Sequence, residues 1–194
     1  FEEHWLTAVL THVSETYADR TASNFGTKVV VPELPFPRIP MAQAQQIVSD
    51  SGHRNERDGD LDPAGERILS EHIQNEFGHE FAFVVDYPVA VRPFYHMRME
   101  DDPGLTKSFD LLWKGLEVTT GTQREHRLDR LEAQAVECGL TPDHIRFYLD
   151  FFKFGCPAHG GFGFGLTRML MVLLGLPAVR ETTFLTRTPR RLTP

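Results

Sequence analysis

Apolar residues recur every three or four positions in several stretches of the chain. Near the start, Trp5, Leu6, Leu10 and Val13 follow this spacing, which predicts an amphipathic helix over residues 1–20. Similar spacing predicts further helices over residues 41–50, 63–77, 124–138, 142–154 and 166–174. The helix at 63–77 has the clearest boundaries, because Asp62 can cap its start and Gly78 can end it.

Runs rich in β-branched and aromatic residues lie between the predicted helices. They predict strands at residues 81–86, 108–113, 115–120 and 159–165, with a further short strand at 29–31. The prolines between residues 32 and 40 then enforce an extended chain. We therefore predict an α+β fold in which an antiparallel sheet is flanked by helices, in one domain over residues 1–194.

Two acidic residues lie seven positions apart in the predicted strands 108–113 and 115–120, at Asp110 and Glu117. A two-residue turn at Lys114 and Gly115 would pair Leu112 with Glu117 and Asp110 with Thr119. Both carboxylates would then lie on one face of the sheet. Such a pair suits a Mg²⁺ ion that bridges phosphates, and the alternative is a pair of solvent-facing acids.

Glycines alternate with phenylalanines in the predicted strand near the end of the chain, where residues 160–168 read GGFGFGLTR. The side chains of Phe162 and Phe164 would lie on one face of the strand, and the glycines would leave the other face without side chains. A flat ligand could approach that face, and Arg168 in the next helical turn suits a phosphate. The alternative is a strand packed tightly against another backbone, followed by a surface arginine.

The composition argues against several classes of protein. The chain is 41% hydrophobic and 24% charged, typical of a globular protein, and its net charge of −7 argues against a broad nucleic-acid surface. It contains no apolar run of about 20 residues and no signal peptide. Cys138 and Cys156 form neither a metal-binding pair nor a disulfide framework, so we expect a cytoplasmic protein with no membrane partner.

The glycine strand and its flanks resemble motif 3 of the class II aminoacyl-tRNA synthetases. Residues 154–159 (FGCPAH), 175–180 (GLPAVR) and 187–192 (RTPRRL) extend the match, and residues 116–127 (LEVTTGTQREHR) resemble the aspartyl and asparaginyl enzymes of subclass IIb. Residues 92–95 (RPFY) and 107–110 (KSFD) are most similar to archaeal-type aspartyl-tRNA synthetases. The resemblance implies a partial class II catalytic fold.

The resemblance also implies roles for individual residues, with ATP and Mg²⁺ as cofactors. The residues implied in ATP binding are Glu117, Gly163, Gly165, Leu166, Thr167 and Arg168. Those implied in catalysis are Arg168, Glu117 and Asp110, and those implied as metal ligands are Asp110, Glu117 and Thr120. Thr120 and Arg124 would bind the amino acid, with the guanidinium fork of Arg124 on its side-chain carboxylate.

The sequence departs from the family pattern in two respects. Motifs 1 and 2, which supply the dimer helix and the arginine on the α-phosphate, are absent, so the resemblance covers the C-terminal half of the catalytic domain. Thr167 stands where the family usually has an acid, and residues 185–187 (LTR) replace an aromatic-proline-arginine sequence. The chain also starts without Met, so we expect an upstream segment, or a homodimer or partner chain, to supply motifs 1 and 2.

Three functions follow from this reading. The first is activation of aspartate as aspartyl adenylate for transfer to tRNA, which missing domains would bind. The second is a tRNA-independent paralogue that passes activated aspartate to an amine, as asparagine synthetase A does. The third is a non-catalytic pseudo-synthetase that acts as a binding module. In each case we expect the isolated 194-residue chain to be inactive.

Overall fold

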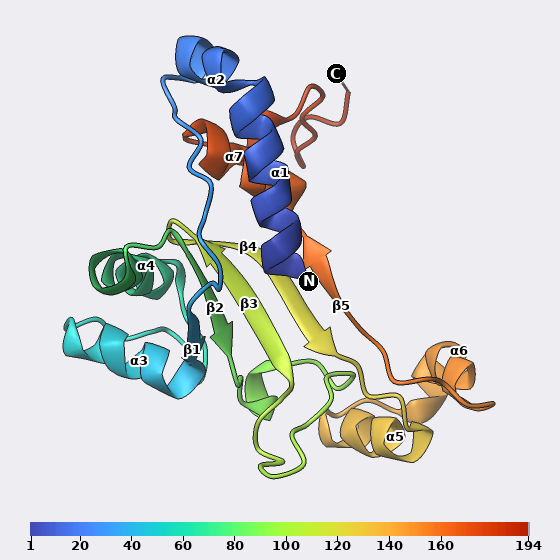
Figure 1. Ribbon diagram of the computed structural model, residues 1–194. Helices are drawn as coiled ribbons and strands as arrows, with labels where there is room; N and C mark the ends of the chain where they lie inside the picture. The colour runs from blue at the N-terminus through green and yellow to red at the C-terminus, as the bar shows by residue number, and fades with distance from the viewer. Residues whose placement is uncertain (194) are drawn as a thin grey trace.

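The computed structural model describes residues 1–193, which are organised around a five-stranded sheet (Figure 1). The strands, in their order across the sheet, are β1 (Arg38–Pro40), β2 (Phe81–Val85), β3 (Ser108–Trp113), β4 (Leu116–Gln123) and β5 (Gly160–Phe164). β1 runs parallel to β2, and every other neighbouring pair is antiparallel. The four longer predicted strands are confirmed.

The strand predicted at residues 29–31 is wrong. Val30 and Val31 are 46% and 38% exposed and pair with no strand. The short strand forms later, at β1, where Ile39 is buried and aligns with Val84 of β2. Burial of Ile39 against the sheet therefore decides where the extended, proline-rich segment pairs.

Seven helices surround the sheet within residues 1–193. They are α1 (Glu2–Thr16), α2 (Ala18–Phe25), α3 (Met41–Asp50), α4 (Pro63–Phe77), α5 (Leu128–Glu137), α6 (Arg146–Leu149) and α7 (Leu166–Leu174). The helix predicted over 1–20 is broken at Tyr17, whose backbone leaves the helical region at φ −122° and ψ 10°. The helix predicted over 142–154 is a single α-turn between two 3₁₀ turns. None of these helices is long and apolar enough to cross a bilayer.

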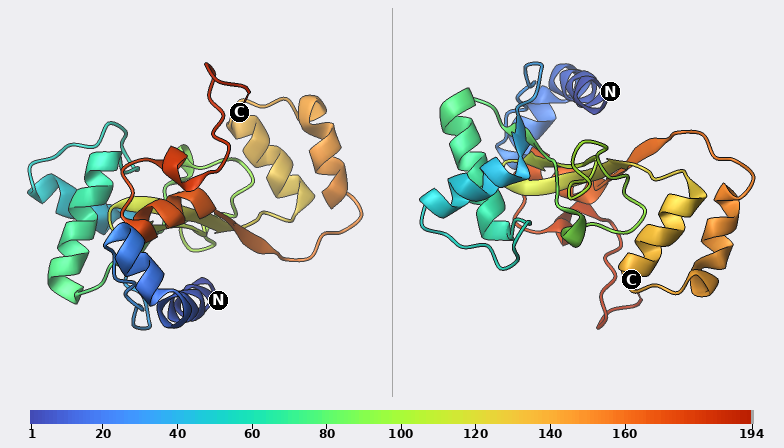
Figure 2. Two further views of the ribbon diagram at one scale, coloured as in Figure 1. Left: turned by 90° about the horizontal axis from the view of Figure 1, so that it is seen from above. Right: turned by 90° about the horizontal axis from the view of Figure 1, so that it is seen from below.

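The helices cover the two faces of the sheet unequally. α1 and α7 pack on one face, where Leu6, Leu10 and Met169 meet Leu111 and Trp113 (Figure 1). α3 and α4 pack on the opposite face and cover β1, β2 and β3 through a second apolar cluster. α5 and α6 form a third small cluster at the far end of the sheet from α3 and α4 (Figure 2). Within residues 1–193, this second cluster contains no residue of β4 or β5, although α4 contacts the start of β4 through Glu66.

The β3–β4 hairpin differs from its predicted register by one residue. Lys114 and Gly115 form the two-residue turn, with φ of 49° and 81°, and Leu112 lies opposite Glu117 as predicted. A β-bulge then inserts Val118, so Asp110 lies opposite Thr120 and the predicted Asp110–Thr119 pairing is wrong. Because of the extra residue, the residues of β4 after Val118 face the opposite side of the sheet from the side they would face in a regular strand.

Glu2 anchors the start of α1 to the covered face of the sheet. The Thr119 hydroxyl donates a hydrogen bond to the Glu2 carboxylate, and both residues are buried, at 1% and 5% exposure. The second oxygen of Glu2, Oε2, has no hydrogen-bond partner. Burial raises the pKa of the Glu2 carboxyl above its ordinary value, and the Thr119 hydrogen bond offsets only part of that rise.

We predict that Glu2→Gln stabilises the chain at pH 8 and does not do so near pH 4. A raised folded-state pKa contributes stability that is fully present below the unfolded pKa and is lost as the pH rises through the folded pKa. Removing the buried, half-paired charge should therefore gain about 1 kcal/mol at pH 8. Urea unfolding at both pH values measures the difference, with Glu15→Gln on the exposed side of α1 as the control. A Glu2→Gln effect that does not change with pH would contradict this account.

Candidate active site

Three predicted site residues share the open part of the α3/α4 face. Asp110 aligns with Val84 of the second apolar cluster on one side and with Thr120 on the other. Glu117 and Thr120 are three positions apart and would face opposite ways in a regular strand. The bulge at Val118 brings them to one face, where Thr120 Oγ1 donates to Glu117 Oε1 at 3.0 Å.

Arg168 joins this group from the first turn of α7. Its Nη1 donates to the Glu117 carbonyl at 2.9 Å and to Glu117 Oε1 at 3.2 Å. The start of the helix is fixed beside the bulge because the Gly165 N–H donates to the Val118 carbonyl at 3.0 Å. Leu166 and Thr167 begin the same helix, with the Leu166 side chain 59% exposed. The sequence-predicted ATP residues from 165 to 168 therefore adjoin Glu117.

Electrostatics around Glu117 favour binding of a cation or a proton. Burial raises the pKa of the Glu117 carboxyl, and the negative charge of Asp110 adds to the rise. The Thr120 hydroxyl and the Arg168 guanidinium act in the opposite direction. Glu66 of α4 lies beside them, and burial raises its pKa to about 7, with Glu117 and Asp110 adding to the rise.

A buried arginine holds Asp110 in place. Arg92 Nη2 donates to Asp110 Oδ2 at 2.5 Å, and the two side chains are only 11% and 7% exposed. The guanidinium carbon of Arg92 lies 3.5 Å from the ring centre of Tyr87. Asp110 Oδ1 and Arg92 Nε are buried and have no hydrogen-bond partner within residues 1–193.

Arg124 lies at the other end of the site, just beyond β4. The guanidinium carbon of Arg124 lies 4.6 Å from the ring centre of Tyr95. The backbone N–H of Arg124 donates to the backbone carbonyl of His159 at 2.9 Å. These three side chains line a hollow of about 540 Å³ that also includes Gly161. Within residues 1–193, no hydrogen bond or ion pair joins Arg124 directly to Asp110, Glu117 or Thr120.

His96 is close enough to Arg92 and Arg124 to feel the charge of both. Burial, together with the positive charges of Arg92 and Arg124, lowers the pKa of its imidazole to about 4. His96 is therefore neutral at physiological pH, and its Nδ1 has no hydrogen-bond partner. Because Arg92 is paired with Asp110, Arg124 is the residue that gives this end of the site its positive charge.

The glycine strand provides an open floor. Phe162 and Phe164 of β5 point to the α1 face, where the Phe164 ring lies 4.9 Å from that of Trp5. Gly163 aligns with Thr120 and so lies on the site face. A Cβ built at Gly161 would meet nothing within 4 Å, and one at Gly163 would meet only the Thr120 carbonyl, at 4.0 Å. The strand therefore leaves room for a ligand at Gly161 and Gly163, whereas its two ends pack tightly: a Cβ at Gly160 would lie 3.0 Å from the Thr122 carbonyl and one at Gly165 3.2 Å from the Val118 carbonyl.

The acidic residues suit a divalent ion that takes its other ligands from a nucleotide and from water. Within residues 1–193, no three His, Cys, Asp or Glu side chains are arranged to hold a metal by themselves. Mg²⁺ in nucleotide sites uses one or two carboxylates together with phosphates and water. Asp110 and Glu117, which supply two carboxylates on one face of the hairpin, match that requirement in number and type.

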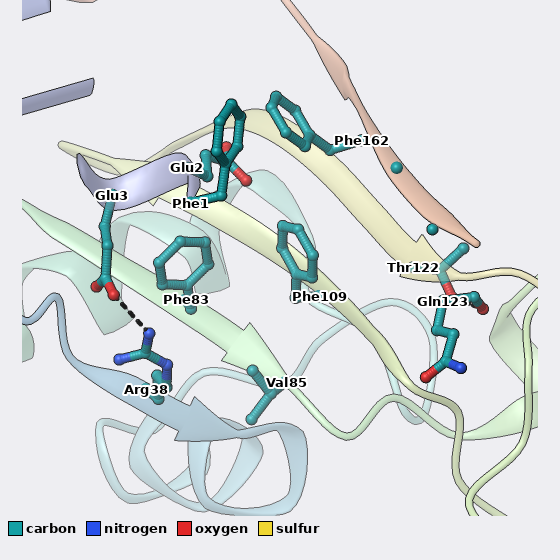
Figure 3. A pocket seen from close by; sticks show the side chains of 12 residues that line it. Phe1, Glu2, Glu3, Arg38, Phe83, Val85, Phe109, Thr122, Gln123 and Phe162 are labelled. Atoms are coloured by element: carbon teal, nitrogen blue, oxygen red, sulfur yellow. Dashed lines mark hydrogen bonds and ion pairs between the residues drawn. The ribbon is translucent and has the colours of Figure 1, made fainter. Parts of the chain in front are cut away.

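Another hollow, of about 520 Å³, lies on the α1 face of the sheet (Figure 3). Figure 3 shows Phe83 and Phe109 beneath it and Phe1 and Phe162 above, with the Glu3–Arg38 ion pair at one side. None of Asp110, Glu117, Thr120, Arg124 and Arg168 lines it.

Sequence reasoning missed Glu66, Arg92 and Tyr95 as parts of the site. Glu66 follows a helix start and reads there as an ordinary first-turn acid. Arg92 and Tyr95 fall within the RPFY segment, which was informative only as part of the resemblance. A charged residue between apolar and proline residues was the one available signal at Arg92.

Known proteins resemble this chain along its whole length. The family described as tRNA synthetases class II (D, K and N) matches residues 1–189. The aspartate–tRNA(Asp/Asn) ligase of Aeropyrum pernix is 45% identical over 170 residues, covering 86% of this chain and 38% of that relative.

Solved structures give the same picture. The aspartyl-tRNA synthetase of Entamoeba histolytica superposes with a TM-score of 0.92 at 30% identity, covering 100% of this chain and 40% of that protein. The asparaginyl-tRNA synthetase of Pyrococcus horikoshii gives a TM-score of 0.87 at 30% identity, covering 100% of this chain and 46% of that protein. This chain therefore spans less than half the length of the proteins it matches.

We predict that Arg92→Met destabilises the chain by about 3–5 kcal/mol, because it leaves the buried Asp110 carboxylate without its partner. The double variant Arg92→Met/Asp110→Leu should recover most of that loss. Arg38→Met is the matched control, because Arg38 is 52% exposed in its pair with Glu3 and its loss should cost less than about 1 kcal/mol. Denaturant unfolding measures all three, and equal losses for Arg92→Met and Arg38→Met would show that the buried pair has no special role.

Proposed function

The chain belongs to the class II tRNA synthetases of the aspartate, lysine and asparagine group, and from this we propose that it is the C-terminal part of the catalytic domain of an aspartate–tRNA ligase. We call the synthetase-length protein that would contain it the full-length parent. That protein would activate aspartate with ATP and Mg²⁺ as aspartyl adenylate in the cytoplasm and transfer it to tRNA.

One observation carries the proposal. A connected strip of charged and hydroxyl side chains crosses the open face of the sheet, beside a floor of glycines. It runs from Arg168 through Glu117, Thr120 and Asp110 to Arg92, with His96 and Arg124 beyond. Phosphates suit the end at Arg168, and a carboxylate suits the end at Arg124.

The chemistry needs alignment and charge neutralisation. A carboxylate oxygen of aspartate attacks the α-phosphorus of ATP, a new O–P bond forms, and the bond to pyrophosphate breaks. Arg168, held against Glu117 and next to a helix N-terminus, would bind the terminal phosphates. The open face of Gly163 would lie under the adenine, and Gly165 would adjoin it at the start of α7. Holding both reactants in line supplies much of the rate.

Mg²⁺ bound with ATP would neutralise phosphate charge. Asp110, Glu117 and Thr120 are the residues that would hold it. Arg92 would fix the orientation of Asp110 for this role through its hydrogen bond to Oδ2. The Thr120 hydroxyl, which donates to Glu117, adds an oxygen on the same face and would also contact the amino acid.

Arg124 would select the side chain of the substrate. Its guanidinium rests against the Tyr95 ring, which fixes its plane at the hollow beside His159. A planar fork can bind both oxygens of a carboxylate, whereas an amide offers only one acceptor.

We predict that two variants of the full-length parent separate the two substrates. Arg124→Ala should weaken aspartate binding by about 2–5 kcal/mol and leave ATP binding almost unchanged, because a charged bidentate contact is lost. Gly163→Ala should weaken ATP binding and leave the melting temperature unchanged, because its new methyl group meets no protein atom closer than 4.0 Å. Calorimetric titration with each ligand measures both effects. Equal losses of both ligands in either variant would contradict the assigned positions.

We predict that the isolated 194-residue chain exchanges pyrophosphate with ATP at least about 100-fold more slowly than the full-length parent. Nothing in the chain corresponds to the arginine of motif 2, and losing one preorganised donor to the reacting phosphate costs about 10²–10³ in rate. Aspartate-dependent pyrophosphate exchange measures both proteins, and tRNA charging by the parent tests the acceptor. Exchange without charging would favour an amine acceptor, and no exchange by either protein would favour a pseudo-synthetase.

A further inference from the structure

Glu66 contacts the proposed ATP end of the site although no motif includes it. It lies in the first turn of α4, and its Oε2 accepts a hydrogen bond from the Glu117 N–H at 3.3 Å. Its side chain is partly buried and is close enough to Glu117, Asp110 and Arg168 to feel the charge of each.

The backbone of Glu117 needs partners from outside the sheet. β4 pairs with β5 only from Thr119 onward, so β5 offers no hydrogen-bond partner to Glu117. Arg168 donates to the Glu117 carbonyl, and Glu66 accepts from its N–H. A backbone group at a bulge that lacks such a partner would be free to shift.

The position of Glu66 is fixed by packing around the first turn of α4. Asp62 caps the helix by accepting from the N–H groups of Ala64 and Gly65, at 2.9 Å and 2.8 Å. At the turn between β3 and β4, a Cβ on Gly115 would lie 3.0 Å from the Cα of Arg67, so helix and turn are in direct contact. The backbone at Glu66, between these two contacts, is therefore held beside the β3–β4 hairpin, within reach of the Glu117 N–H.

We propose that Glu66 is a positioning residue for ATP: by accepting the Glu117 N–H, it holds the bulged segment so that the Glu117 side chain and Arg168 together meet the phosphates. This inference rests on the proposed function, because it takes Glu117 and Arg168 as the ATP end of the site. It assigns Glu66 the role of a hydrogen-bond acceptor rather than of a metal ligand or a catalytic acid.

The test compares two near-isosteric variants in the full-length parent. Glu66→Gln keeps an acceptor oxygen, and Glu66→Met fills similar space with only a weakly accepting sulfur. We expect Glu66→Met to raise the Kd for Mg·ATP by about three- to tenfold, the loss typical of one hydrogen bond. Glu66→Gln should recover most of that affinity, and the Kd for aspartate should stay within about twofold in both variants.

Calorimetric titration with Mg·ATP gives the Kd without requiring turnover, and pyrophosphate exchange should show the same change in the KM for ATP. Glu71→Met, on an exposed position of α4, is the matched control for general effects on the helix. If Glu66→Met does not fold, Glu66→Ala replaces it in the comparison with Glu66→Gln.

Three results would overturn the inference: wild-type affinity for Mg·ATP in Glu66→Met, an equal defect in Glu66→Gln, or equal losses for ATP and aspartate. The second result would mean that the charge of Glu66 matters rather than its acceptor oxygen. A wild-type parent that binds no Mg·ATP would instead refute the proposed function, so the two failures are distinguishable.

Discussion

The single extra residue in β4, Val118, is the constraint on which the candidate site depends. Without it, the alternation of a regular strand would place Glu117 and Thr120 on opposite faces. With it, both face the open side, and Thr119 turns to the covered side, where it binds Glu2 of α1. The bulge also leaves the carbonyls of Glu117 and Val118 available to Arg168 and Gly165. One local irregularity therefore connects the helix before the sheet, the acids on it and the helix after it.

The charges of the site are arranged so that no acidic residue stands far from a basic one. Asp110 is buried with Arg92, and Glu117 contacts Arg168 at the more exposed edge. A buried pair of this kind adds little net stability, because desolvation of both ions offsets much of their attraction. Its effect is orientation: Arg92 holds the Asp110 carboxylate through one of its oxygens, Oδ2. Stability comes mainly from the two apolar clusters on either side of the sheet.

One face of the sheet packs against the core helix α1, and the opposite face carries the candidate site. The α1 face carries the aromatic side chains of β5, which pack on Trp5, and the opposite face of the same strand carries only glycine. Because side chains alternate along a strand, one short sequence can serve both purposes. Within residues 1–193, the apolar cluster under α3 and α4 includes residues of β1, β2 and β3 but none of β4 or β5, so the polar strip lies beside a covered core. α4 nevertheless reaches the site through Glu66 at its first turn.

The sequence by itself determined the longer strands, the turn at Lys114 and Gly115, the two faces of the glycine strand and the family, because these depend on local spacing and turn chemistry. It misplaced the first short strand and joined α1 to α2, where burial and a single break in backbone geometry decide the outcome. It also paired Asp110 with Thr119, since alternation alone does not reveal a bulge. Only the tertiary structure brought Glu66 and Arg92 to the acids, from 51 and 18 residues away along the chain. Their side chains meet the site because helix α4 and the segment after β2 pack against the same hairpin, and such contacts between distant segments leave no periodic signal in a sequence.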